Sequence, residues 1–230
     1  MDNEIKLSKD GSVHVTNEIF NTTSHMISSM FALLGLVILI VKSSIMGDPW
    51  KIIGFSLYGT SLLCMLLCST FHHGINAGSK IDSFLRLFDY IAIFPLIAGT
   101  YTPFCIITLR ENSSWVTWGW SIFGVIWFIA IVGIVIKAVF PAVPKWVTNA
   151  IYVGMGWVGA VLIIPIFKIL GWEASVLVVL GGLFYTIGSF IFYMEKPNPI
   201  IGKFGFHEIW HIFVILGGLS HFIVMYFYVL

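Results

Sequence analysis

Histidine side chains that could bind a metal ion occur in an apolar segment near the end of this sequence. His207 and His211 are four residues apart. In a helix, residues at this spacing lie on one face, about 6 Å apart along the axis. Two imidazoles placed in this way can bind one ion, as in helical zinc sites. The spacing alone is a weak signal, so a metal site here needs further ligands from elsewhere in the chain.

A second histidine pair, His72 and His73, ends an earlier apolar segment. His73 follows Ser69 by four residues, which places these two side chains on one helix face, whereas His72 points about 100° away. We therefore expect His73 to face the site and His72 to be an interfacial polar group. Three histidines would leave the fourth position of a tetrahedral zinc ion to water, as in catalytic rather than structural zinc sites.

Asp89 is the acidic residue best placed to act on such a water, because it lies at the start of the next apolar segment. Zinc lowers the pKa of bound water to about 7, and a nearby carboxylate can hold that water or accept its proton. Each residue also has a simpler explanation. Asp89 alone could form an interfacial ion pair with Arg86 or Lys80. Ser69 alone could hydrogen bond to the backbone of its own helix.

For three further polar residues, the evidence that they belong to the metal site is weaker. Glu18 and His25 could support the metal ligands from behind, but capping of the first helix together with Asn21 is the simpler expectation. His221 lies about 15 Å beyond His211 along the same helix. We expect His221 to make an interhelical hydrogen bond rather than to provide a fourth ligand.

The elements that must position these residues are membrane helices. The chain has 230 residues, of which 58% are hydrophobic and 10% are charged. Soluble domains have about 45–50% apolar and about 25% charged residues, so a soluble fold could not cover this much apolar surface. The net charge of +1 gives no polybasic patch for nucleic acid. We expect an all-α integral membrane protein with one domain, 1–230, whose residues 1–23 form a polar cytoplasmic tail.

Seven apolar segments, each long enough to cross a bilayer, are separated by short connections with turn residues or charges. The expected spans are 24–46, 50–73, 84–109, 115–137, 146–168, 174–194 and 207–229. Eight lysine and arginine residues fall on one side of these spans and four on the other. This bias predicts a seven-transmembrane helix bundle with the N-terminus in the cytoplasm and the C-terminus outside.

This topology places the polar clusters at one depth. Spans one, three and seven begin on the cytoplasmic side, and span two ends there. Ionisable groups in the hydrocarbon region are costly and usually functional. A common site explains why four separate clusters share one level.

The sequence resembles the hemolysin III family over essentially its whole length. The resemblance is carried, in order, by residues 18–25 (EIFNTTSH), 69–73 (STFHH), 88–104 (FDYIAIFPLIAGTYTPF) and 206–211 (FHEIWH). That family is related to the progestin and adiponectin receptors and, more distantly, to alkaline ceramidases. The resemblance implies zinc bound by His73, His207 and His211, with Asp89 and Ser69 beside the zinc water. Many bacterial members have histidine directly after the aspartate, where this chain has Tyr90.

Three functions agree with these features. The first is a zinc-dependent hydrolase of a membrane lipid amide, similar to a ceramidase, with Asp89 and Ser69 as catalytic residues. The second, from the family name, is a cytolytic or pore-forming protein, although no ring of repeated charges suits a filter. The third is a metal-containing sensor or receptor without turnover. The short tail is typical of bacterial members and predicts a location in the bacterial inner membrane, with a membrane lipid as partner.

Overall fold

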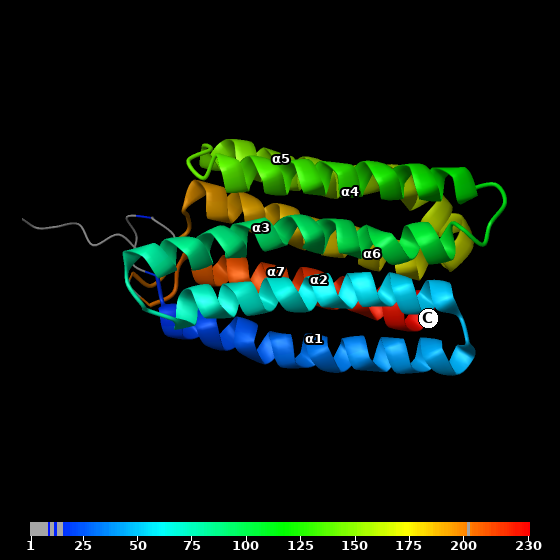
Figure 1. Ribbon diagram of the computed structural model, residues 1–230, viewed down its shortest axis with the longest axis horizontal. Coiled ribbons are helices and arrows are strands. Elements are labelled where there is room, and N and C mark those ends of the chain that lie inside the picture. Colours follow the sequence, from blue (N-terminus) through cyan, green and yellow to red (C-terminus); the bar gives the residue numbers. More distant parts are fainter. Residues whose placement is uncertain (1–8, 10–11, 13–15, 202) are drawn as a thin grey trace, which may run out of the picture.

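The computed structural model describes residues 9, 12, 16–201 and 203–230 of the chain. Apart from one β-bridge between Ile200 and Phe204, the regular structure of these residues is helical. The helices lie side by side along the longest axis of the molecule (Figure 1). Their bounds are α1 Glu18–Met46, α2 Pro49–Gly74, α3 Ser79–Pro103, α4 Val116–Val139, α5 Lys145–Val158, α6 Ile163–Met194 and α7 Phe206–Val224.

The first helix begins earlier than the expected span start at residue 24. The side chain of Asn17 caps α1, because its Oδ1 atom accepts a hydrogen bond from the backbone N–H of Phe20 at 3.1 Å. Such a cap satisfies one of the backbone donors that have no partner in the first turn of a helix. The polar residues 18–23 therefore form the first turns of α1.

Six helices of the described residues are long and apolar enough to cross a membrane. They are Glu18–Met46, Pro49–Gly74, Ser79–Thr108, Val116–Val139, Lys145–Met194 and Phe206–Val229, with π-helical turns at Phe104–Thr108 and Met225–Val229 and a 3₁₀ turn at Gly159–Leu162. Large apolar side chains on their outer faces are exposed, among them Phe31, Phe128 and Trp172. Apolar outer surfaces of this kind are stable in lipid. These helices indicate an integral membrane protein.

One of these six helices is interrupted. Within Lys145–Met194, Gly171 has φ 88° and ψ 179° and leaves the helical conformation. A side chain would make this conformation strained, so glycine is required here. The sequence predicted a connection between the spans 146–168 and 174–194, and the residue that leaves the helical conformation there is Gly171.

The packing of the helices brings the expected site residues to one end of the bundle. Helix α2 packs against both α1 and α3, and α7 packs against both α6 and α1. Figure 1 shows that α1, α3 and α7 begin, and α2 ends, at the same end of the molecule. The polar clusters of four helices therefore lie at one level, as the sequence predicted.

Candidate metal centre

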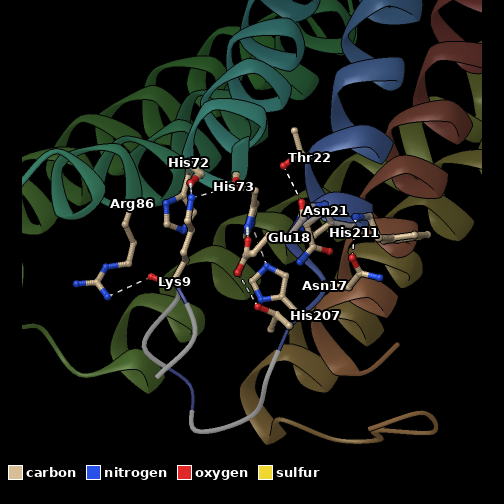
Figure 2. A network of polar contacts seen from close by, with 12 residues as sticks. Lys9, Asn17, Glu18, Asn21, Thr22, His72, His73, Arg86, His207 and His211 are labelled. Carbon is tan, nitrogen blue, oxygen red and sulfur yellow. Dashed lines mark hydrogen bonds and ion pairs between the residues drawn. The ribbon is translucent and has the colours of Figure 1, made fainter. Parts of the chain in front are cut away.

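The structure brings together three buried histidines from two helices. His73 is at the end of α2, and His207 and His211 are on the first turns of α7. One nitrogen from each imidazole lies within 4.8 Å of one nitrogen from each of the others. The Nε2 atoms of His73 and His207 are 3.2 Å apart. Figure 2 shows these side chains pointing toward one another.

The donor set fits a metal ion. Zinc–imidazole distances of 2.0–2.1 Å in a tetrahedron place two ligand nitrogens about 3.3 Å apart, which is close to the separation of His73 Nε2 and His207 Nε2. The three histidines are 3%, 4% and 1% exposed in the order of the sequence, so bulk water does not compete for their nitrogens. This buried triad could hold a metal ion.

Glu18 holds the ring of His73 from behind. Its Oε2 atom lies 2.6 Å from His73 Nδ1, and the hydroxyl of Thr16 donates to its Oε1 atom at 2.7 Å. A carboxylate on one ring nitrogen fixes the tautomer and directs the other nitrogen to the metal. The expectation that Glu18 only caps α1 was therefore wrong, because Asn17 provides the cap. The spacing of Glu18, Asn21 and His25 along one helix face was the signal in the sequence.

His25 and Ser24 of α1 contact His211 directly. The rings of His25 and His211 are stacked, with centroids 3.8 Å apart and an interplanar angle of 20°. The Ser24 hydroxyl is 3.4 Å from His211 Nδ1. His25 is 1% exposed, and among the described residues neither of its ring nitrogens has a hydrogen-bond partner of normal geometry. Helix α1 thus supports both ends of the triad, Glu18 at His73 and His25 at His211.

Glu208 lies between two candidate ligands in the sequence but points away from them. Its Oε1 atom accepts hydrogen bonds from Asn17 N at 2.5 Å and Asn21 Nδ2 at 3.3 Å, and its Oε2 atom accepts one from Gly205 N at 2.7 Å. It is 1% exposed. Glu208 therefore joins the start of α1 to the start of α7. This carboxylate sets the position from which Glu18 reaches His73.

Asp89 and Ser69 lie beside the triad. Carboxylate and imidazole atoms of Asp89, His72 and His73 come within 4.8 Å of one another, and the Ser69 hydroxyl hydrogen bonds to Asp89. No ion pair includes Asp89 among the described residues. The Arg86 guanidinium instead donates to the backbone oxygen of Lys9 at 3.4 Å, so the ion pair considered for Asp89 does not form.

His72 and His221 lie outside the triad. His72 is 1% exposed and its ring is tilted against that of His73, so other protein atoms enclose it, and its expected depth at the membrane interface stays a prediction. The Lys9 ammonium covers this end of α2 by donating to the backbone oxygens of His72, His73 and Ile75. His221 donates from Nδ1 to the backbone oxygen of Gly217, one turn earlier in α7, at 2.9 Å. Its hydrogen bond is intrahelical, not interhelical as expected.

An apolar cavity of about 240 Å³ opens beside the triad. Ser69, Asp89 and His25 form part of its wall at one end. Its other wall residues come mainly from α3, α5, α6 and α7 and include Leu96, Phe104, Ile166 and Val214. From Asp89 in α3 to Phe104, the first residue of the π-helical turn that follows it, the wall extends about 22 Å. The polar residues of the site therefore lie at one end of a long apolar cavity.

Comparison with known proteins shows the family of this chain. The family model described as haemolysin-III related matches residues 13–222. The chain belongs to the haemolysin-III-related family. "Hemolysin-3" of Bacillus cereus is similar, with 36% identity over 216 residues that cover 94% of this chain and 93% of that protein. The "Hemolysin-3 homolog" of Bacillus subtilis (strain 168) is 34% identical over 214 residues, which cover 93% and 95% of the two chains.

The haemolysin-III match includes every residue of the candidate metal centre, from Glu18 to His211. The resemblance seen in the sequence motifs is confirmed. Both relatives match nearly end to end, so the similarity extends over the whole helical bundle.

Proposed function

We propose that this chain is a zinc-dependent hydrolase of a membrane lipid amide. The observation that carries the proposal is the position of the Asp89–Ser69 pair, which lies between the histidine triad and the apolar cavity. A lipid chain in the cavity would place its polar end beside these residues. The combination of metal ligands, a carboxylate and an apolar chamber is suited to hydrolysis of an acylated lipid.

Each residue of the candidate site has a distinct role in this reaction. His73, His207 and His211 would hold zinc, which when bound supplies a nucleophilic hydroxide near neutral pH. Asp89 takes the proton of the attacking water and returns it to the leaving amine. The Ser69 hydroxyl, turned from Asp89 to the substrate, donates a hydrogen bond to the carbonyl oxygen as negative charge develops on it. Glu18 keeps the His73 ring oriented throughout.

The proposed topology has seven crossings with the N-terminus in the cytoplasm. The 50 residues of Lys145–Met194 would extend about 75 Å as one helix, more than twice the hydrocarbon thickness of about 30 Å. The break at Gly171 allows this segment to cross twice. Together with the lysine and arginine bias of the sequence, seven crossings would put the metal centre in the inner leaflet of the membrane. In bacteria this membrane would be the cytoplasmic membrane.

Metal analysis and product formation test the proposal together. The purified wild type should contain about one zinc per chain and release fatty acid from acyl-amide lipids. The double variant His207→Ala with His211→Ala should lose both properties. His221→Ala is the matched control, because His221 lies on the same helix but outside the triad, and it should retain zinc. Zinc retained undiminished in the double variant would end the proposal.

A second candidate function is membrane permeabilisation. It is favoured by the name of a relative, "Hemolysin-3" of Bacillus cereus. Dose-dependent leakage of dye from liposomes, unchanged in the double histidine variant, would favour this function over hydrolysis.

A further inference from the structure

Lys137 is a buried cation that the proposed reaction does not use. It lies in the last turn of α4 and is 7% exposed. Lysine near the end of a membrane helix normally extends its ammonium group to water or lipid headgroups. An ionisable residue kept inside a membrane helix is costly and usually has a functional partner.

No carboxylate compensates the charge of Lys137 within the part of the chain that the structure describes, where none of the ion pairs includes it. Its ammonium nitrogen donates to the backbone oxygen of Pro141 at 3.2 Å and lies 5.1 Å from the centre of the Tyr90 ring. Arg86, on α3, adds a second positive charge that acts on it electrostatically. The surroundings of Lys137 therefore favour an anion.

The position of Lys137 connects it to the metal centre. Lys137 and Lys145 belong to the wall of the same cavity as Asp89 and Tyr90. Lys145 is paired with Glu195 at 3.0 Å, which leaves Lys137 as the uncompensated ammonium of the two. Tyr90 follows Asp89 directly in α3, and its ring contacts Lys137. If the reactive group of a ligand lies at Asp89, the ligand atoms bonded next to that group lie near the Lys137 ammonium.

Capping of α4 does not account for these observations. A lysine in the last turn can donate to the final carbonyl groups of its helix and gains from the helix dipole. An exposed side chain would give the same gain without the cost of burial. The inward position of Lys137, at a cavity wall with no acidic partner among the described residues, calls for another explanation.

We propose that Lys137 binds the anionic headgroup of the lipid that enters the cavity, so that the ligands of this protein are acyl lipids with a phosphate or similar anion close to the acyl linkage. That such a lipid is also a substrate rests on the hydrolase proposal. Binding of the headgroup does not depend on the hydrolase proposal, because it requires only the cavity and the Lys137 cation.

A matched pair of uncleavable lipids tests the headgroup site. The pair consists of N-palmitoylethanolamine and its phosphate ester, each with a methylene in place of the amide nitrogen. Dissociation constants would be measured by calorimetry on the purified full-length chain in uncharged detergent. A hydrogen bond to a charged group contributes enough for about a tenfold change in affinity. We expect the wild type to bind the phosphate ester about tenfold more tightly than the alcohol.

Three variants assign this preference to Lys137. Lys137→Met should bind both lipids equally, and Lys137→Arg should keep most of the preference for the phosphate. Lys168→Met is the control, because Lys168 lies over the Trp115 ring and is not part of the cavity wall. This control should behave as the wild type.

Several outcomes would overturn the headgroup site. Equal binding of the two lipids by the wild type would do so even if Lys137→Met failed to fold. A phosphate preference that survives in Lys137→Met would also do so. Palmitate is tested in parallel, and an equal loss of palmitate binding in Lys137→Met would assign the lysine to the carboxylate of a fatty acid instead. If the phosphate preference depends on Lys137 but no acyl amide is cleaved, the hydrolase proposal fails and the headgroup site stands.

Discussion

The Nδ1 atom of His73 lies 2.6 Å from the Oε2 atom of Glu18, although 55 positions of the sequence separate the two residues. This contact joins the end of α2 to the start of α1. It leaves Nε2 of His73 directed at His207, which is the geometry of a metal ligand whose second nitrogen is held by a carboxylate.

Replacement of Glu18 by glutamine should weaken metal binding without removing a ligand. The amide keeps the size of the side chain but cannot hold the His73 ring as strongly, and loss of such partners typically costs 10- to 100-fold in affinity. Competition with a zinc chelator would measure the effect. Glu173→Gln is the control, because Glu173 is bonded to Tyr228 and has no contact with the triad. Equal affinities in Glu18→Gln and wild type would contradict the role given to Glu18.

Replacement of Glu208 by alanine should destabilise the fold. It would leave the backbone N–H groups of Asn17 and Gly205 without their partner, at a cost of about 1–3 kcal/mol for each group. Thermal unfolding in the presence of chelator measures this loss without a contribution from metal. Glu208→Gln, which retains one acceptor, should lie between alanine and wild type. A melting temperature unchanged in Glu208→Ala would show that this carboxylate does not join α1 to α7.

Replacement of Asp89 by asparagine should separate chemistry from metal binding. The amide cannot accept a proton, so release of fatty acid should fall by about 10²- to 10⁴-fold, while the zinc content stays at the wild-type level because all three histidines remain. Parallel metal and product assays on one preparation provide the comparison. Unchanged turnover would remove Asp89 from the mechanism, and lost zinc would make it a ligand.

Replacement of Gly171 by alanine should destabilise the protein by about 1–3 kcal/mol, because a side chain is strained at φ 88°. Gly182→Ala is the matched control, since Gly182 is helical and its added methyl group would meet nothing within 4 Å. Thermal unfolding of both variants provides the test. Equal stability of the two would mean that α6 accepts a different turn at this point.

Much of the site could be predicted from the sequence because its ligands follow helical spacing. The separation of His207 and His211, and that of Ser69 and His73, fixes which side chains share a face. The alternation of apolar segments and short connections then places those faces at one end of the bundle. Both inferences need only the geometry of single helices and the thickness of a membrane.

The parts that could not be predicted depend on contacts between helices. Glu18 was expected to cap its own helix, and only the packing of α1 against α2 shows that it reaches His73. His72 was expected to be an interfacial polar group, and only the packing of the helices shows that its side chain is buried against the ring of His73. The burial of Lys137 beside the cavity likewise depends on the packing of α4 against α3 and α5. In each case the side chain has several possible partners, and tertiary packing selects one of them.

X-ray absorption at the zinc edge of the purified wild type tests the central claim most directly. We expect three imidazole nitrogens at 2.0–2.1 Å and one further oxygen ligand, with the imidazole signal lost in the variant that carries both His207→Ala and His211→Ala. A spectrum with sulfur ligands, or one that is unchanged by removal of these two histidines, would contradict a metal centre built from His73, His207 and His211.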